Sequence, residues 1–521
     1  MLNQSKEYLI LLLKYKRGGI FLLINQLLNS ETQLELSLLQ TLFVHRVWLA
    51  TQELQDYCQK SRNTIIKYCE ILKEEAENIK KEDLIQHERG KGYRFNGTKE
   101  DYQTLFISLI QRSPSFDLLR QLLLKEKVSL IQFAEQHYID TMTVRLMLKK
   151  FNRYAKKIDL SFQIANGNLR VVGPELTVRY FSYTFFWFVY KGTVWPFPGI
   201  SESQLRSFAE RTFAKYAHVN DVIIHQWAYI LAVNMTRISN GYSITKEMLP
   251  DFSEDFIEAI YLSKNHQESE RFFNDAKQFS SFSHEEVIYF LLLMHTGVRV
   301  YTVDGICSRA LEFHKDNKTI LYEKGKVIHA YFPEFEQATA ENKMLANSVI
   351  MAALLNLILF PKFTVSISGY DYHKYMEENL PYLKQEILKR IKKMQKNDDF
   401  FVTSQEYLLL RLSEMYTLIG NPVDFNPKIT VRLETDLPLT LEKLMKTRLL
   451  SLFGSFYHLS IITSLDKENR IEPDLIVSST KPMSQVKQNI PIIYVNPKFM
   501  NSDLKDLTEA FKKLIVQQRS E

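Results

Sequence analysis

The chain has 521 residues, and 45% of them are hydrophobic, so it is long enough for several domains with folded cores. The formal net charge is +6, and residues 1–175 hold 26 of the 66 basic and 20 of the 60 acidic residues, so the whole excess lies in the first third. A basic N-terminal third suits a phosphate-backbone partner, and three cysteines without a CxxC pair exclude a disulfide framework and a cysteine-based metal site.

The first 30 residues are apolar but contain charges. Lys14, Lys16, Arg17 and two glycines cut the apolar stretch into runs much shorter than the ~20 residues that a membrane span needs. No small-residue cleavage site follows the first run, so a signal peptide is not expected. We therefore predict an N-terminal extension at residues 1–30 that packs against the first domain of a cytoplasmic protein.

Residues 50–96 predict a helix-turn-helix followed by a basic hairpin. Ser61 can cap the second helix, because its hydroxyl accepts hydrogen bonds from backbone N–H groups that have no intrahelical partner. Apolar residues recur on that helix at spacings of three and four, which makes one buried stripe: Ile65, Tyr68, Cys69 and Leu72. Two alternating strands then surround residues 89–92, where glycine supplies the positive φ of a hairpin turn. This layout is typical of a winged helix-turn-helix, in which the second helix enters a DNA major groove.

The outward polar residues of this module are the candidate DNA contacts. They are Ser61, Arg62, Asn63 and Lys67 from the second helix, and Arg89, Lys91 and Arg94 from the hairpin. An ordinary helical pair with a surface hairpin would show a similar pattern, so the interpretation depends on a second observation.

That observation is a second copy of the pattern. Helices are expected at residues 100–111 and 116–124, Ser129 caps a short helix, and Asp140 or Thr141 caps a long one over residues 142–158. A hairpin with its turn at 166–167 follows. With an offset of 79 residues, Ser61 falls on Asp140 and Leu72 on Phe151. The candidate DNA contacts of this copy are Thr141, Thr143 and Arg145. A tandem pair of winged helices favours a nucleic-acid partner.

From residue 173 to about 397 the pattern changes to long helices with dense aromatic and aliphatic faces. These stripes are typical of the cores of helical bundles. Two blocks fit, at residues 174–284 and 285–397. Their histidines are not spaced with carboxylate or cysteine partners as in a zinc site, so no metal and no cofactor is predicted.

Residues 398–521 alternate short apolar strands with helices, which predicts a small α/β domain with a mostly parallel sheet. No glycine-rich phosphate loop follows any of the expected strands. The predicted fold class is therefore mostly α and multidomain, with two winged helix-turn-helix domains at residues 31–98 and 99–173, two helical bundles, and an α/β tail.

Taken together, the two winged helices, the hairpin ending in GNLRVVGPE, the TVWPFPGIS segment, the helical blocks and the tail resemble the Mga/AtxA family. Its members are Gram-positive transcriptional regulators that contain PTS regulation domains (PRDs), named for the sugar phosphotransferase system (PTS). The resemblance implies a cytoplasmic regulator, an activator rather than an enzyme, that binds promoter regions of double-stranded DNA. It also implies PRD-like blocks phosphorylated on histidine, with phospho-HPr as a partner, and an enzyme IIB-like tail that forms a homodimer.

Two departures from the family pattern stand out. PRDs usually present a histidine within a pattern like E-x-x-[YF]-[IL]-x-x-H, but counting from Glu286 puts Leu293 at that place, two residues before His295. The candidate acceptors are therefore His225, His295, His329 and His373, although for each of them the sequence favours a structural role. A working IIB domain carries its phosphate on a cysteine just after the first strand, where this chain has Glu434-Thr435-Asp436.

Two other classes of protein stay open from the sequence. One is a PTS-linked antiterminator that binds RNA, although such proteins begin with a small β-rich RNA domain and nothing before residue 173 resembles one. The other is a phosphotransfer protein of the sugar phosphotransferase system, against which the missing tail cysteine argues. No catalytic residue and no metal ligand is predicted.

Overall fold

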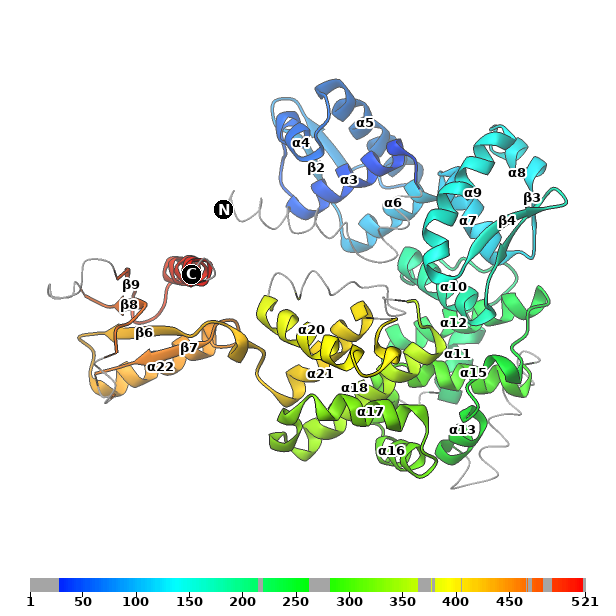
Figure 1. Cartoon of the computed structure of the whole chain (residues 1–521). Coiled ribbons are helices and arrows are strands. Elements are labelled where there is room, and N and C mark those ends of the chain that lie inside the picture. Colours follow the sequence, from blue (N-terminus) through cyan, green and yellow to red (C-terminus); the bar gives the residue numbers. More distant parts are fainter. Residues whose placement is uncertain are drawn as a thin grey trace. The chain divides into compact units, whose positions relative to one another are not determined.

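The computed structural model describes residues 28–213, 219–261, 282–363, 380–403, 405–464, 471–480 and 490–518, together with Met376 and Asp466. The described residues are mostly helical, with a helix-turn-helix region near the N-terminus and a parallel sheet near the C-terminus (Figure 1). Residues 1–27 of the expected extension and His373 lie outside the described residues.

The chain divides into two compact units. The first comprises Met1–Ala330, Asn347–Lys374 and Asp399–Leu408, and the second comprises Tyr331–Ala346, Tyr375–Asp398 and Leu409–Glu521. Both predicted helix-turn-helix modules therefore belong to the first unit, and the predicted α/β tail belongs to the second.

The first unit begins with a helix-turn-helix and a hairpin, which we call the first copy. Its elements are α3 (Ser30–His45), α4 (Thr51–Cys58), α5 (Arg62–Asn78), β1 (Ile85–Glu88) and β2 (Gly92–Phe95). The two strands are antiparallel, and Gly90 and Gly92 at their turn have φ of 86° and 96°, as expected for glycines in a hairpin turn. The predicted stripe of α5 is buried, since Ile65, Cys69 and Leu72 have no exposed surface.

A second helix-turn-helix and hairpin, the second copy, follows α6 (Lys99–Gln111). Its elements are α7 (Pro114–Leu124), β3 (Val128–Ser129), α8 (Leu130–Gln136), α9 (Thr141–Ala155), β4 (Ser161–Ala165) and β5 (Asn168–Val172). The turn at Asn166 and Gly167 has positive φ at both residues, which confirms the predicted two-residue turn. The short strand β3 was not predicted, and it pairs with β5 to make a sheet of order β3-β5-β4. Helix α9 ends at Ala155 and continues as one 3₁₀ turn to Ile158.

Helices make up the rest of the first unit. They are α10 (Glu175–Tyr190), α11 (Glu202–Phe213), α12 (Asp221–Ser239), α13 (Ser253–Tyr261), α15 (His284–His295), α16 (Ile306–Asp316), α17 (Ile320–Ala330) and most of α18 (Ala340–Leu359). These helices agree with the long apolar helices that the sequence predicts for this region.

A buried ionic cluster joins three of these helices. Arg179 on α10 has no exposed surface and donates to both carboxylate oxygens of Glu286 on α15, at 2.5 and 2.7 Å. Arg179 also donates to Glu175, which accepts from Arg237 on α12 at 2.7 Å. Because every charge in the cluster has a partner, its burial is tolerated, and removal of one partner would leave another charge unpaired. The contact between α10 and α15 crosses the boundary expected at residue 284.

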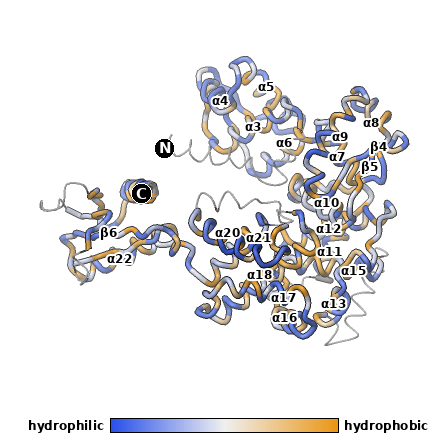
Figure 2. The backbone as a smooth tube through the Cα atoms, in the orientation of Figure 1, coloured by the Kyte–Doolittle hydropathy of each residue, from blue (hydrophilic) through white to orange (hydrophobic). Residues whose placement is uncertain are grey.

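Helix α18 is long and apolar enough to resemble a membrane span, and no other described helix is. Its 18-residue apolar window is 67% buried inside the structure, as in the core helix of a globular protein. Figure 2 colours the backbone of the described residues by hydropathy.

The second unit contains α20 (Pro381–Gln395), most of α21 (Gln405–Ile419) and an α/β tail. The tail's elements are β6 (Ile429–Glu434), α22 (Leu439–Phe453), β7 (Leu459–Ile462), β8 (Leu475–Ser478), β9 (Ile492–Tyr494) and α23 (Asn501–Gln518). All three strand pairings are parallel and the order is β7-β6-β8-β9, which confirms the predicted parallel sheet. Phe453 of α22 meets Phe511 of α23 edge to face with ring centroids 5.2 Å apart, so both helices cover the same face of the sheet.

Candidate nucleic-acid interface

The second helix of the first copy, α5, begins as the sequence predicts. Ser61 is its N-cap, and the Ser61 hydroxyl accepts from the Thr64 backbone N–H at 3.4 Å. Arg62, Asn63 and Lys67 are exposed on the first two turns. These three side chains are therefore available to a groove, as expected for the N-terminal end of a recognition helix.

The hairpin of the first copy presents its three basic residues unequally. Arg89 is exposed at the turn. Lys91 forms an ion pair with Glu88 at 2.7 Å, and Arg94 donates to the Gln86 side chain at 2.7 Å while its guanidinium lies 5.0 Å from the ring centroid of Trp48. Arg94 is thus held by its own hairpin, and Arg89 is the hairpin residue best placed to contact a DNA backbone.

In the second copy, Asp140 rather than Thr141 caps α9. The Asp140 carboxylate accepts from the Thr143 backbone N–H at 2.7 Å and from the Thr143 hydroxyl at 3.0 Å, and these hydrogen bonds lower the pKa of Asp140. Thr143 is half-buried and its hydroxyl is committed to the cap, whereas Thr141 and Arg145 are exposed. Of the three predicted contacts, Thr141 and Arg145 are therefore free to reach a ligand.

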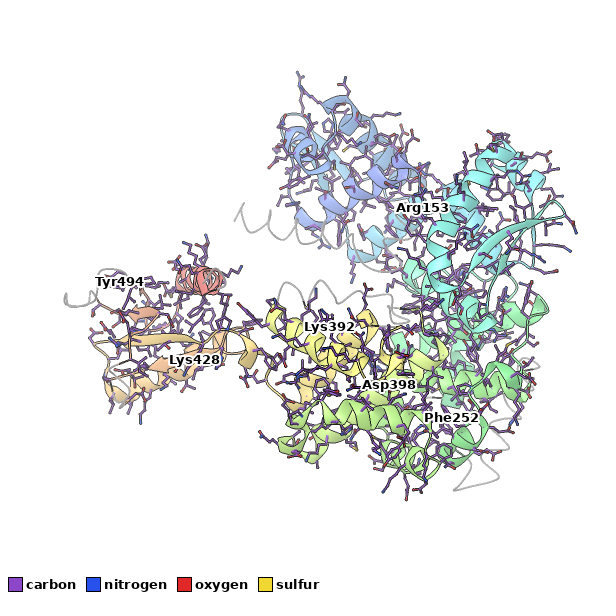
Figure 3. The ribbon with its side chains drawn as sticks, in the orientation of Figure 1. Arg153, Phe252, Lys392, Asp398, Lys428 and Tyr494 are labelled. Atoms are coloured by element: carbon purple, nitrogen blue, oxygen red, sulfur yellow. The ribbon has the colours of Figure 1, made fainter. Side chains whose placement is uncertain are left out.

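Of the basic surface formed by α9, sequence reasoning predicted only Arg145 as a DNA contact. Arg145, Lys149, Arg153 and Lys156 recur at intervals of three or four on one side of α9 and the turn after it, and they line a groove beside Phe162 and Ile164 of β4. All four are exposed, and none forms an ion pair within the described part of the chain. Figure 3 marks Arg153 on this helix. The signal was present as basic residues every three or four positions, but only the first turn of the helix was predicted to contact DNA.

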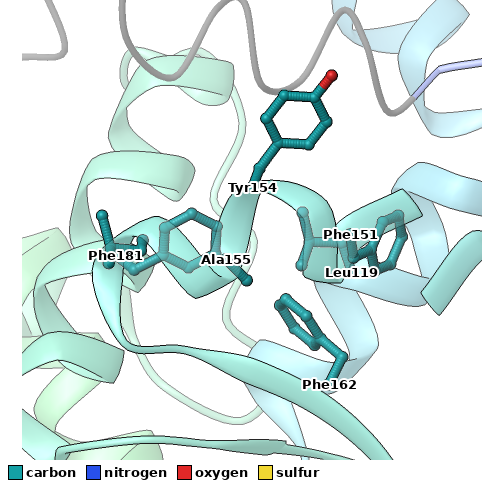
Figure 4. A pocket seen from close by; sticks show the side chains of 7 residues that line it. Leu119, Phe151, Tyr154, Ala155, Phe162 and Phe181 are labelled. Atoms are coloured by element: carbon teal, nitrogen blue, oxygen red, sulfur yellow. The ribbon is translucent and has the colours of Figure 1, made fainter. Parts of the chain in front are cut away.

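Beneath the basic side of α9 lies a small apolar pocket. It is lined by Phe151 and Ala155 of α9, Leu119 of α7, Phe162 of β4 and Phe181 of α10 (Figure 4). Because the inner side of α9 is fixed to a helix and to the hairpin, its outer side chains are held on a rigid frame.

The candidate phosphorylation sites lie in different environments. His295 is fully buried, its Nε2 is 2.9 Å from the Tyr261 hydroxyl, and burial lowers the pKa of His295 to about 3. His329 is exposed, with its Nε2 2.7 Å from the Asn347 side-chain oxygen. A phosphoryl donor could reach His329 directly, whereas His295 would require local opening of the bundle.

His225 lies between these extremes. It is half-buried on α12, its Nε2 is 2.8 Å from a carboxylate oxygen of Glu202 on α11, and burial is the main cause of its lowered pKa. Gly192 leaves room for the imidazole, since a Cβ at that position would come within 2.7 Å of the ring.

The tail carries a different kind of surface. At the end of β6 the chain has Glu434, Thr435 and Asp436, and no cysteine follows Cys307 in the sequence. The tail therefore lacks the cysteine that carries the phosphate in a working IIB domain. Helix α22 exposes Leu441, Leu444 and Leu452 on one side, and Phe456 is exposed just beyond its end. Angular spacing places these three leucines on one stripe of the helix, next to the side that Met445, Leu449 and Phe453 bury against the sheet.

The capped second helices, the hairpins and the basic side of α9 are the features of a helix-turn-helix protein. Residues 98–186 match the family described as the Mga helix-turn-helix domain, and this match covers α6, the second copy and most of α10. The chain therefore carries a Mga helix-turn-helix domain and is a distant relative of the Mga/AtxA regulators.

Three curated proteins are similar to this chain over part of its length. It is 23% identical over 237 residues to a putative trans-acting regulator of Streptococcus pneumoniae serotype 4, which covers 44% of this chain and 46% of the relative. It is 24% identical over 245 residues to the capsule synthesis positive regulator AcpA of Bacillus anthracis (46% and 48%), and 22% identical over 222 residues to AcpB of the same organism (42% and 44%). The chain thus spans about half the length of the curated relatives it matches.

Proposed function

We propose that this chain is a DNA-binding transcriptional regulator of the Mga/AtxA type, and a positive regulator as the names of its relatives AcpA and AcpB say of those proteins. The observation that carries the proposal is the exposed basic side of α9 (Arg145, Lys149, Arg153 and Lys156) within the matched Mga domain. Exposed cations on a recognition helix and beside a hairpin neutralise phosphates and release counterions. The proposed setting is the cytoplasm, and the proposed role is not catalytic.

A titration with labelled nucleic acids tests this function. The full chain is mixed with a pool of random 30-bp DNA duplexes, an RNA hairpin of the same length and a single strand, at about 150 mM salt. Preferential retention of duplex DNA, abolished in the variant Lys149→Glu/Arg153→Glu, supports the proposal. Equal or stronger retention of the RNA hairpin would instead favour the antiterminator class.

The proposed assembly is a homodimer through the tail, and the exposed leucine stripe of α22 supports it. Apolar side chains on an otherwise polar helix face are typical of surfaces that a partner covers. We expect Leu441→Glu/Leu444→Glu to yield a monomer in light scattering, while Lys443→Glu, an exposed control on the same helix, leaves the dimer. A dimer that persists in the double variant would contradict this interface.

Control by phosphorylation is the last part of the proposal. A phosphorylated imidazole would add negative charge at a helix surface and change packing there. His225 and His329 are the proposed acceptors in the described region because neither is fully buried, with His373 as a further candidate from the sequence. Incubation with phospho-HPr followed by mass spectrometry of His225→Ala and His329→Ala variants tests this. His295→Ala serves as the control, and we expect it to retain full labelling.

A further inference from the structure

The outer side of α9 holds two exposed apolar residues among its cations. Met142 is 63% exposed and Leu146 is 55% exposed, and both belong to the first two turns of the helix. Their neighbours on the same outer side are Thr141, Arg145 and Lys149. Large apolar side chains at these places are poorly accounted for by phosphate binding, because phosphates are contacted by cations, hydroxyls and N–H groups.

We propose that Met142 and Leu146 read thymine methyl groups in the major groove of A·T base pairs. The proposal rests on the proposed function, since it assumes that α9 enters a groove of duplex DNA. The thymine methyl is the one apolar group that the four bases present in the major groove, and apolar side chains are its natural contacts. The cations beside the two residues bind the flanking phosphates and so direct this side of the helix toward DNA.

The spacing of the two residues sets the spacing of the bases. Residues four apart in an α-helix are displaced by about 6 Å along its axis. Neighbouring base pairs are about 3.4 Å apart, so two steps cover about 7 Å. Met142 and Leu146 therefore fit methyl groups two base pairs apart, with Arg145 between them facing the backbone or a guanine edge.

The first copy does not share this property. At the offset of 79 residues, Asn63 stands in place of Met142 and Lys67 in place of Leu146. Asparagine pairs with adenine and lysine with guanine through hydrogen bonds. The two copies would thus recognise bases by different chemistry, with methyl recognition confined to the second.

Replacing thymine with uracil tests the proposal, because uracil lacks only the methyl group. The full chain first selects duplexes from a random 30-bp pool, and a selected duplex is then resynthesised with deoxyuridine in place of each thymidine in turn. We expect wild-type affinity to fall about fourfold for each thymine methyl that is removed from a contact position, at two positions two base pairs apart. Met142→Ala/Leu146→Ala should bind the thymine and uracil duplexes within twofold of each other.

Ile131→Ala is the matched control, since Ile131 is 59% exposed but lies on α8. It should keep the wild-type preference for thymine. Equal wild-type affinity for thymine and uracil duplexes would overturn methyl recognition and would leave the patch to a protein partner, with DNA binding itself intact. Failure to retain any duplex from the pool would instead overturn the proposed function.

Discussion

The two helix-turn-helix copies have the same pattern of buried residues in their cores and differ on their outer surfaces. At the offset of 79 residues, Ile65 and Val144, Cys69 and Leu148, and Leu72 and Phe151 are buried pairs. The exposed or half-exposed residues Glu70, Glu74 and Glu77 correspond to Lys149, Arg153 and Lys156. Helix α5 contains three basic and four acidic residues, whereas α9 contains four basic and no acidic residues.

This difference shows what the helical repeat does and does not encode. The apolar spacing determines that both helices pack in the same way, and it says nothing about what each outer side contacts. A carboxylate at each position of Glu70, Glu74 and Glu77 would repel phosphates that Lys149, Arg153 and Lys156 attract. The second copy therefore is the main DNA contact in our account, and the first copy contributes through Arg62, Asn63 and Lys67 of α5 and Arg89 of its hairpin.

The largest expected effect is a loss of stability when an equivalent core residue of either copy is removed. Phe151→Ala and Leu72→Ala should each destabilise their own copy, by about 3–5 and 2–5 kcal/mol, because each removes a buried side chain and leaves a cavity. Hydrogen exchange of peptides from residues 114–172 and 30–95 measures the two effects separately. We expect each variant to lose exchange protection in its own copy. If only one of the two variants loses protection, the two cores are not equivalent.

The next largest effect is a loss of DNA affinity, which should differ between charge reversals on α9 and on α5. Lys149→Glu/Arg153→Glu should weaken binding to random 30-bp duplex about a hundredfold at 150 mM salt, because two phosphate contacts become repulsions. The matching pair Arg62→Glu/Lys67→Glu should weaken it by less. A larger loss from the α5 pair would reverse the roles assigned to the copies.

The reciprocal change should increase affinity. Glu74→Arg/Glu77→Lys gives α5 two of the cations that α9 carries, and both glutamates are exposed, so folding should be unaffected. We expect duplex affinity to rise about tenfold, with a steeper dependence on salt. Unchanged affinity would mean that this side of α5 does not lie near DNA even when its charge permits it.

The smallest effect concerns the helix caps. Asp140→Ala should lower the melting temperature of the second copy more than Ser61→Ala lowers that of the first, since the Asp140 contact to the Thr143 N–H is 2.7 Å and the Ser61 contact to the Thr64 N–H is 3.4 Å. Hydrogen exchange near residues 141–144 and 62–65 reports each cap.

The same pair predicts a difference in pH dependence. The pKa of Asp140 is lowered in the folded chain, so its stabilising contribution is present above the ordinary aspartate pKa of 3.8 and is lost as pH falls through the lowered value. Ser61 does not titrate, so acid should loosen the start of α9 and leave the start of α5 unchanged. Equal loosening of both starts would contradict the cap assignment.

Much of the fold was predictable from the sequence, for identifiable reasons. Ser61 and Ser129 mark helix starts by capping, Asn166-Gly167 marks a tight turn, and the apolar alternation of β6 marks a strand. The strand β3 has only two residues, too few for a periodic signal, and it exists because β5 offers it a partner.

The site was less predictable than the fold, because exposure and pairing are tertiary properties. Arg94 and Thr143 were predicted as contacts from their positions, and the structure adds that Gln86, Trp48 and Asp140 interact with them. His295 was predicted as an acceptor from its place near a motif, and the sequence did not indicate that it is fully buried. Lys149 and Arg153 became evident only once the basic residues of α9 were seen on one open side beside β4.

The central claim is that α9 is the main DNA contact and that the side of α5 with Glu70, Glu74 and Glu77 does not lie against DNA, and site-specific photocrosslinking tests it most directly. A benzoylphenylalanine is placed at residue 153 of one protein and at the equivalent residue 74 of another, and each full chain is irradiated with a labelled random 30-bp duplex. We predict a strong crosslink from residue 153 and a weak one from residue 74. A crosslink from residue 74 as strong as that from residue 153, or stronger, would contradict the account.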